Sequence, residues 1–184
     1  MNSVRAEHPA AGAQVRPLIA ELEIRQRVEE LGRQIREDAG QREIVLICIL
    51  KGSVVFAADL LRAIPGDVAL EFLRAKSYGQ SQVSSGKLEI LQDVDRDLAG
   101  SYVVIVEDII DTGLTLHGLQ KLFRARKVET LKTVALLLKP QQDHQVEVDY
   151  FGFRIGSEFV VGYGLDWAER LRNLPYIGVV EGSS

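Results

Sequence analysis

The chain contains few of the residues that cross-link or stiffen small secreted domains, with one cysteine, five prolines and one tryptophan among its 184 residues. Because a single cysteine cannot form an intrachain disulfide, Cys48 favours a reduced compartment, and we expect a cytoplasmic protein. No apolar run reaches the length of a signal peptide core or a membrane span, so we expect no membrane partner. The composition, 46% hydrophobic and 26% charged, excludes collagenous and wholly disordered chains.

Positive charge is also in short supply, because the formal net charge is -4. Such a chain has no long-range attraction for a phosphate backbone, so nucleic-acid binding would need a local basic patch. The densest basic cluster, Arg124, Arg126 and Lys127, falls where an amphipathic helix should end. Cations are favoured at that end of a helix, so the cluster predicts a solvated helix end and no nucleic-acid partner.

Several well-known site motifs are missing as well. There is no P-loop, no dinucleotide-binding glycine motif and no H-E-x-x-H zinc motif. The histidines, His8, His117 and His144, are too dispersed to predict a metal site.

Two apolar patterns alternate along the chain. Amphipathic segments with helical spacing predict helices at about residues 20–38, 54–64 and 114–126. Continuous apolar runs predict strands buried on both faces at residues 44–50, 102–106 and 133–138. Strands and helices in this order predict an α/β fold with an open, mainly parallel sheet flanked by helices.

The remaining segments predict smaller additions to this sheet. Strands at about 68–74 and 87–91 should form a hairpin arm, and the Ser- and Gly-rich residues 77–86 between them should be a mobile loop. Short segments at 150–155, 158–161 and 176–180 predict a small irregular subdomain over one end of the sheet.

We found no boundary between two independent cores. We therefore expect one domain over residues 17–184, with a hood formed by its N-terminal and C-terminal segments. Residues 1–16 should be a flexible extension.

The stretch from 103 to 115 carries the most informative motif. A buried strand is followed by Glu107 and Asp108, then by Asp111, and then by a Thr-Gly-x-Thr turn that opens a helix. Helix-start amides and hydroxyls can hold a phosphate monoester, whereas carboxylates can bind sugar hydroxyls, attract Mg²⁺ or act as a base. The pattern therefore points to a sugar phosphate. The simpler alternative, solvated acids and an ordinary helix cap, does not explain three acids beside buried runs.

The run from Val104 to Gly113 resembles the phosphoribosyl pyrophosphate motif of type I phosphoribosyltransferases, in particular those of the hypoxanthine (hypoxanthine-guanine) branch. Further segments resemble the pyrophosphate loop, the flexible active-site loop, the strand with the purine-contacting lysine and the purine hood of that family. The pyrophosphate loop corresponds to residues 50–52, and the flexible loop to 77–79 with 83–86. The lysine strand corresponds to residues 136–139, and the purine hood to 159–166 with 172–175.

The resemblance implies transfer of the phosphoribosyl group to a 6-oxopurine, giving a purine ribonucleoside monophosphate and pyrophosphate with Mg²⁺ as cofactor. It implies that Glu107 and Asp108 hold the ribose hydroxyls and that Asp111 is the base facing purine N7. The 5′-phosphate would be cradled by Asp111, Thr112, Gly113, Leu114 and Thr115. Leu114 departs from members with a basic residue there, which removes one cation from the phosphate turn.

Other roles follow from the same resemblance. Lys139 would donate to the purine 6-oxo group, Phe159 would stack on the ring, and the Val160 backbone would meet the ring edge. Asp166 would bind Mg²⁺, with Glu107 and Asp108 as further candidate ligands. We interpret Tyr163 and Trp167 as packing residues, with Trp167 near the hood.

The resemblance also assigns the pyrophosphate and the lid. Lys51, Gly52 and Arg172 would lie near the pyrophosphate, and a non-proline cis peptide would join Leu50 to Lys51. Ser77 and Tyr78 would belong to a loop that closes over the site and excludes water.

Two alternatives have less support. A regulator that keeps this fold and acts on RNA or DNA would need a basic surface that the sequence lacks. An enzyme for adenine, uracil or orotate is disfavoured by the combination of Lys139 with residues 159–166. The preference among hypoxanthine, guanine and xanthine stays open, and we expect a homodimer or homotetramer.

Overall fold

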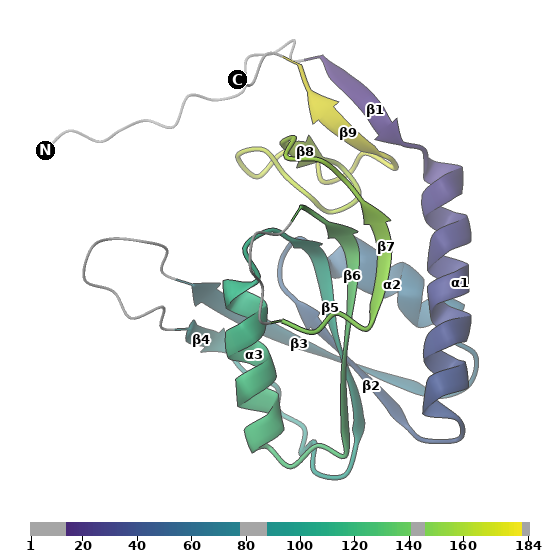
Figure 1. Cartoon of the computed structure of the whole chain (residues 1–184), viewed down its shortest axis with the longest axis vertical. Coiled ribbons are helices and arrows are strands. Elements are labelled where there is room, and N and C mark those ends of the chain that lie inside the picture. Colours follow the sequence, from purple (N-terminus) through teal and green to yellow (C-terminus); the bar gives the residue numbers. More distant parts are fainter. Residues whose placement is uncertain (1–13, 78–87, 141–145, 182–184) are drawn as a thin grey trace, which may run out of the picture.

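The computed structural model describes residues 14–77, 88–140 and 146–181, and its centre is a six-stranded sheet of order β4-β3-β2-β5-β6-β7 (Figure 1). Its strands are β2 (Ile44–Ile49), β3 (Val68–Ser77), β4 (Leu88–Gln92), β5 (Tyr102–Ile110), β6 (Thr130–Leu138) and β7 (Tyr150–Arg154). All neighbours are parallel except β3 and β4, which form the expected antiparallel arm. The predicted open, mainly parallel α/β sheet is confirmed.

Helices cover both faces of this sheet. α1 (Glu21–Ala39) and α2 (Val54–Ala63) pack on one face, and α3 (Leu114–Ala125) packs on the other (Figure 1). In β2, Ile44 and Leu46 join the core under α1 and α2, whereas Val45 and Ile47 join the core under α3. Side chains alternate across a strand, so burial on both faces requires an apolar residue at every position. Among the helices of the described ranges, none is long and apolar enough to cross a membrane.

A second sheet forms the hood. β1 (Val15–Ile19), β9 (Ile177–Val180) and β8 (Val160–Val161) pair antiparallel in the order β1-β9-β8. Figure 1 shows this sheet beyond the ends of β6 and β7. Because β1 begins at Val15, the last two residues of the predicted extension belong to a strand, and residues 1–13 lie outside the described part. The division of the chain at residue 17 stays a prediction.

One segment lies in a different sheet from the one predicted. Residues 150–155 were expected in the irregular subdomain, but Tyr150–Arg154 is β7, which pairs parallel to β6 at the edge of the central sheet. Of its five residues only Tyr150 is buried, so no continuous apolar run marks it as a central strand. Arg27 of α1 covers it by donating to the carbonyls of Phe151 and Gly152 at 2.7 and 3.2 Å.

Candidate active site

The candidate site lies at the carboxyl ends of β2 and β5, where the strand order reverses. From β2 the chain continues to the neighbouring β3, whereas from β5 it continues to β6 on the opposite side. Ligands of open α/β sheets bind at such a switch point. The structure therefore brings Lys51 and Gly52, which follow β2, to the same edge as the turn that follows β5.

Two buried carboxylates stand near the end of β5. Glu107 is only 8% exposed, and burial, together with the neighbouring Asp108 charge, raises its pKa well above the usual range. Burial also raises the pKa of Asp108, an effect that Arg172 opposes and the Asp166 charge reinforces. A buried acidic pair of this kind is stabilised by hydroxyl donors or a cation.

The turn after β5 encloses a cavity of about 130 Å³. Gly113 adopts a φ of 71°, a left-handed conformation that favours glycine, and directly precedes α3. The start of α3 lies at this turn, and backbone amides at a helix start can hold an anion. The 58% exposed Leu114 stands at the first position of α3. The cavity is lined by Glu107, Ile109, Ile110, Asp111, Thr112, Gly113, Thr115 and Leu116.

The predicted base and the predicted purine-contacting lysine form an ion pair. Lys139 Nζ lies 3.5 Å from Asp111 Oδ2, and the Lys139 amide donates to the Ile110 carbonyl at 3.1 Å. The Asp111 side chain is 66% exposed, whereas that of Lys139 is 16% exposed. The structure therefore brings the ends of β5 and β6 together and leaves the Asp111 carboxylate open to a ligand.

Gly52 is packed between two other segments. The peptide bond between Leu50 and Lys51 is cis, as the resemblance implied. A Cβ added to Gly52 would overlap Asp108 Oδ2 and would lie 2.7 Å from Asp108 Cγ. From the other side, a Cβ added to Gly164 would overlap the Gly52 carbonyl oxygen, and Gly164 has a φ of 100°. Only glycine allows this approach of the hood to the Lys51–Gly52 turn.

The hood supplies an acid, a cation and an aromatic ring. Arg172 Nη2 forms an ion pair with Asp166 Oδ1 at 2.8 Å, and Arg172 Nη1 donates to the Gly164 carbonyl at 2.7 Å. Phe159 is 47% exposed just before β8, so its ring has an open face, and Val160 is buried in β8. Ser77 ends β3 opposite Leu88.

Tyr78 and the rest of the predicted closing loop lie outside the described residues.

Residues 18–167 match the phosphoribosyl transferase domain family. The chain belongs to the phosphoribosyltransferase family. It is 46% identical over 165 residues to the hypoxanthine-guanine phosphoribosyltransferase of Bacillus subtilis, a match covering 89% of this chain and 92% of the relative. It is 45% identical to that of Mycobacterium tuberculosis, covering 89% and 85% of the two chains. The crystal structure of a hypoxanthine-guanine phosphoribosyltransferase from Bacillus anthracis aligns with a TM-score of 0.86 at 46% identity, covering 92% and 99%. The family and the fold predicted from the motifs are confirmed.

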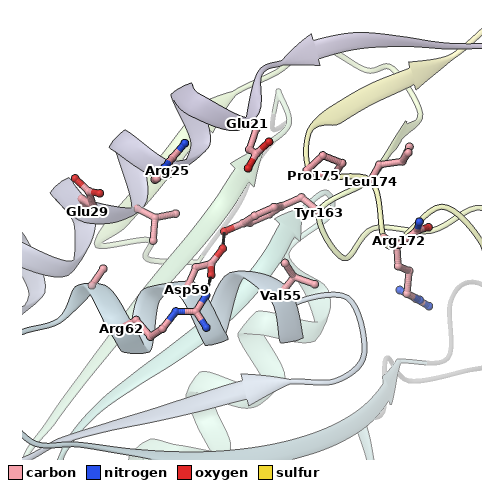
Figure 2. Close-up of a pocket in the computed structure, with 13 residues that line it drawn as sticks. Glu21, Arg25, Glu29, Val55, Asp59, Arg62, Tyr163, Arg172, Leu174 and Pro175 are labelled. Carbon is pink, nitrogen blue, oxygen red and sulfur yellow. Dashed lines mark hydrogen bonds and ion pairs between the residues drawn. The ribbon is translucent and has the colours of Figure 1, made fainter.

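Two further residues of this phosphoribosyltransferase had no predicted site role. Tyr163 donates from its hydroxyl to Asp59 Oδ2 of α2 at 2.5 Å, and Figure 2 shows this contact across a pocket of about 530 Å³. The pocket lies between α1, α2 and residues 172–175. Glu169, in the hood, accepts a hydrogen bond from Lys51 Nζ at 3.0 Å. These partners are 104 and 118 positions apart, so no local pattern reveals either contact.

The residues predicted to bind Mg²⁺ in this phosphoribosyltransferase all carry carboxylates. Among the described residues, no group of three or more His, Cys, Asp or Glu side chains could hold a metal ion. Mg²⁺ in proteins is commonly held by one or two carboxylates together with substrate phosphates. Asp108, near the end of β5, and Asp166, in the hood, supply carboxylates of the kind that this mode requires.

Proposed function

We propose that this chain is a hypoxanthine-guanine phosphoribosyltransferase of purine salvage. It would transfer the 5-phosphoribosyl group from phosphoribosyl pyrophosphate to hypoxanthine or guanine, giving IMP or GMP and pyrophosphate. The observation that carries the proposal is the accessible Asp111 carboxylate, which lies 3.5 Å from Lys139 at the mouth of the phosphate turn. Relatives that match most of the chain bear this enzyme name.

The binding steps follow from the groups at each strand end. The 5′-phosphate enters the cavity at residues 111–115, where the first amides of α3 and the Thr112 and Thr115 hydroxyls can meet it. The ribose hydroxyls donate to the buried carboxylates of Glu107 and Asp108, which replaces the solvent those groups have lost. The purine lies between the Phe159 ring and the Lys139 ammonium, which donates to the 6-oxo group.

In the reaction, purine N9 bonds to ribose C1 as the bond from C1 to pyrophosphate breaks. Positive charge develops on the ribose ring and negative charge on the departing oxygens, which Lys51 and Arg172 stabilise. Asp111 accepts the proton released from purine N7. When bound by Asp166 and Asp108 or Glu107, Mg²⁺ would supply further neutralisation of the pyrophosphate charge.

A base panel tests the proposal. With phosphoribosyl pyrophosphate and Mg²⁺, the enzyme should form nucleotide from hypoxanthine or guanine and not from adenine, uracil or orotate. The same panel with and without a metal chelator tests the need for Mg²⁺. A preference for adenine, or no nucleotide from any 6-oxopurine, would overturn the proposed function.

Two accompanying proposals concern the protein as a whole. Cys48 is a free, buried thiol, which agrees with the cytoplasmic, reducing setting that we propose. A homodimer or homotetramer is the assembly that we propose, and light scattering at assay concentration tests it.

A further inference from the structure

The two cations assigned to pyrophosphate share one carboxylate of the chain. Glu169 Oε2 accepts from Lys51 Nζ at 3.0 Å and from Arg172 Nη2 at 3.2 Å. The same Arg172 nitrogen lies 2.8 Å from Asp166 Oδ1. Lys51 comes from the end of β2 and Arg172 from the hood, so Glu169 joins the two walls of the candidate pyrophosphate site.

The backbone presents Glu169 in an unusual way. Trp167 and Arg170 exchange backbone hydrogen bonds of 3.0 and 3.1 Å, and between them Ala168 and Glu169 adopt φ values of 50° and 65°. Two-residue turns with positive φ at both positions normally use Asn, Asp or Gly. The Glu169 amide is further fixed by donation to Asp166 Oδ2 at 2.8 Å. Strained backbone conformations of this kind cluster at functional sites, which points to a role for this turn.

A carboxylate and a pyrophosphate oxygen compete for the same donors, because both are anionic acceptors for ammonium and guanidinium groups. We propose that Glu169 is a built-in competitor of pyrophosphate, holding Lys51 and Arg172 until pyrophosphate groups displace it and taking them back as product leaves. It thereby lowers the affinity of the enzyme for pyrophosphate and promotes its release. This inference rests on the proposed function, because Lys51 and Arg172 receive their roles there.

The ion pair between Lys51 and Glu169 is exposed, as expected if Glu169 separates from Lys51 when pyrophosphate binds. The Lys51 and Glu169 side chains are 52% and 66% exposed, and exposed ion pairs are weak enough to exchange readily. A buried pair would instead resist separation.

Glu169→Gln tests the inference, because it removes the charge and keeps the side-chain size. Titration calorimetry with inorganic pyrophosphate and Mg²⁺ should show about two- to fivefold tighter binding by the variant than by wild type. Pyrophosphate should also inhibit nucleotide formation more strongly in the variant, by a similar factor. Glu181→Gln, which removes the same charge from an exposed residue just after β9, should bind pyrophosphate as wild type does.

The two proposals fail in distinguishable ways. Equal or weaker pyrophosphate binding by Glu169→Gln, with wild type active, would overturn the competitor role and leave the enzyme assignment standing. Weaker binding would mean that Glu169 instead orients the two cations for pyrophosphate. A wild-type protein that neither binds pyrophosphate nor forms nucleotide would overturn both. A second variant, Glu169→Asp, should bind pyrophosphate more tightly than wild type, because its shorter side chain retreats from both cations.

Discussion

Replacing Gly52 with alanine should damage the active site more than the fold. The new methyl group would meet the Asp108 carboxylate, with only 2.7 Å between the added Cβ and Asp108 Cγ. Ordinary carbon contacts lie at about 3.5–4.0 Å, so the carboxyl group must retreat by at least about 1 Å. Asp108 Oδ1 now accepts from the Ile109 amide at 2.8 Å, and this bond would be strained or lost.

The expected magnitudes differ for the two properties. Overpacking of this kind costs about 1–3 kcal/mol of folding free energy, which a domain of ordinary stability survives. A displacement of about 1 Å in a group that positions substrate can lower kcat/KM by about 10²-fold. We therefore expect Gly52→Ala to remain folded while its kcat/KM for phosphoribosyl pyrophosphate collapses.

Urea unfolding and steady-state kinetics on the same preparations check this. The double variant Gly52→Ala, Asp108→Ala is a matched control, because removing the carboxylate removes the clash. Its loss of stability should be smaller than the sum of the two single losses. Additive stability losses, or a Gly52→Ala enzyme with wild-type kcat/KM, would refute the packing argument.

Three further predictions concern other groups of the site. Asp111→Asn keeps the shape of the side chain and removes the base, so kcat should fall about 10²-fold or more. Binding of phosphoribosyl pyrophosphate, measured by calorimetry, should be largely kept. An unchanged kcat would contradict the role of Asp111 as proton acceptor. Burial raises the folded pKa of Glu107 above its unfolded value, so wild type should lose stability relative to Glu107→Gln as pH rises from about 4 through that folded pKa. Parallel urea-stability profiles against pH would count against this. Tyr163→Phe removes the hydroxyl that donates to Asp59 and should lower the free energy of unfolding by about 1–2 kcal/mol. Tyr176→Phe is the control and should lower it less, because no described residue accepts a hydrogen bond from the Tyr176 hydroxyl. Equal losses in urea unfolding would argue against the contact between Tyr163 and Asp59.

The fold was predictable where the pattern is long and regular. The apolar run at 44–50 corresponds to β2, and the helical spacing at 54–64 corresponds to α2. A strand buried on both faces is apolar at every position, whereas a helix buried on one face is apolar at every third or fourth position, so both patterns are visible in the sequence. The prediction for β7 is wrong because a five-residue edge strand with one buried side chain has no continuous apolar run. β1 was missed for a similar reason, since Ile19 is its only buried residue.

The candidate site was predictable where its residues are contiguous. The carboxylates and the phosphate turn fall within one stretch, 107–115, and the structure brings Lys51 and Lys139 to that stretch as strand order requires. The cis bond at Leu50–Lys51 came from the family resemblance, and spacing alone does not predict it. The Glu169 and Tyr163 contacts depend on how the hood folds back over α2 and β2, which no local pattern encodes.

A crystal structure of the enzyme with product nucleotide, pyrophosphate and Mg²⁺ tests the site assignment most directly. We predict the 5′-phosphate at the 111–115 turn, the purine between Phe159 and Lys139, and pyrophosphate against Gly52 and Arg172 with Glu169 displaced. Nucleotide bound instead in the pocket of about 530 Å³ between α1 and α2, with the 111–115 turn unchanged, would contradict the account.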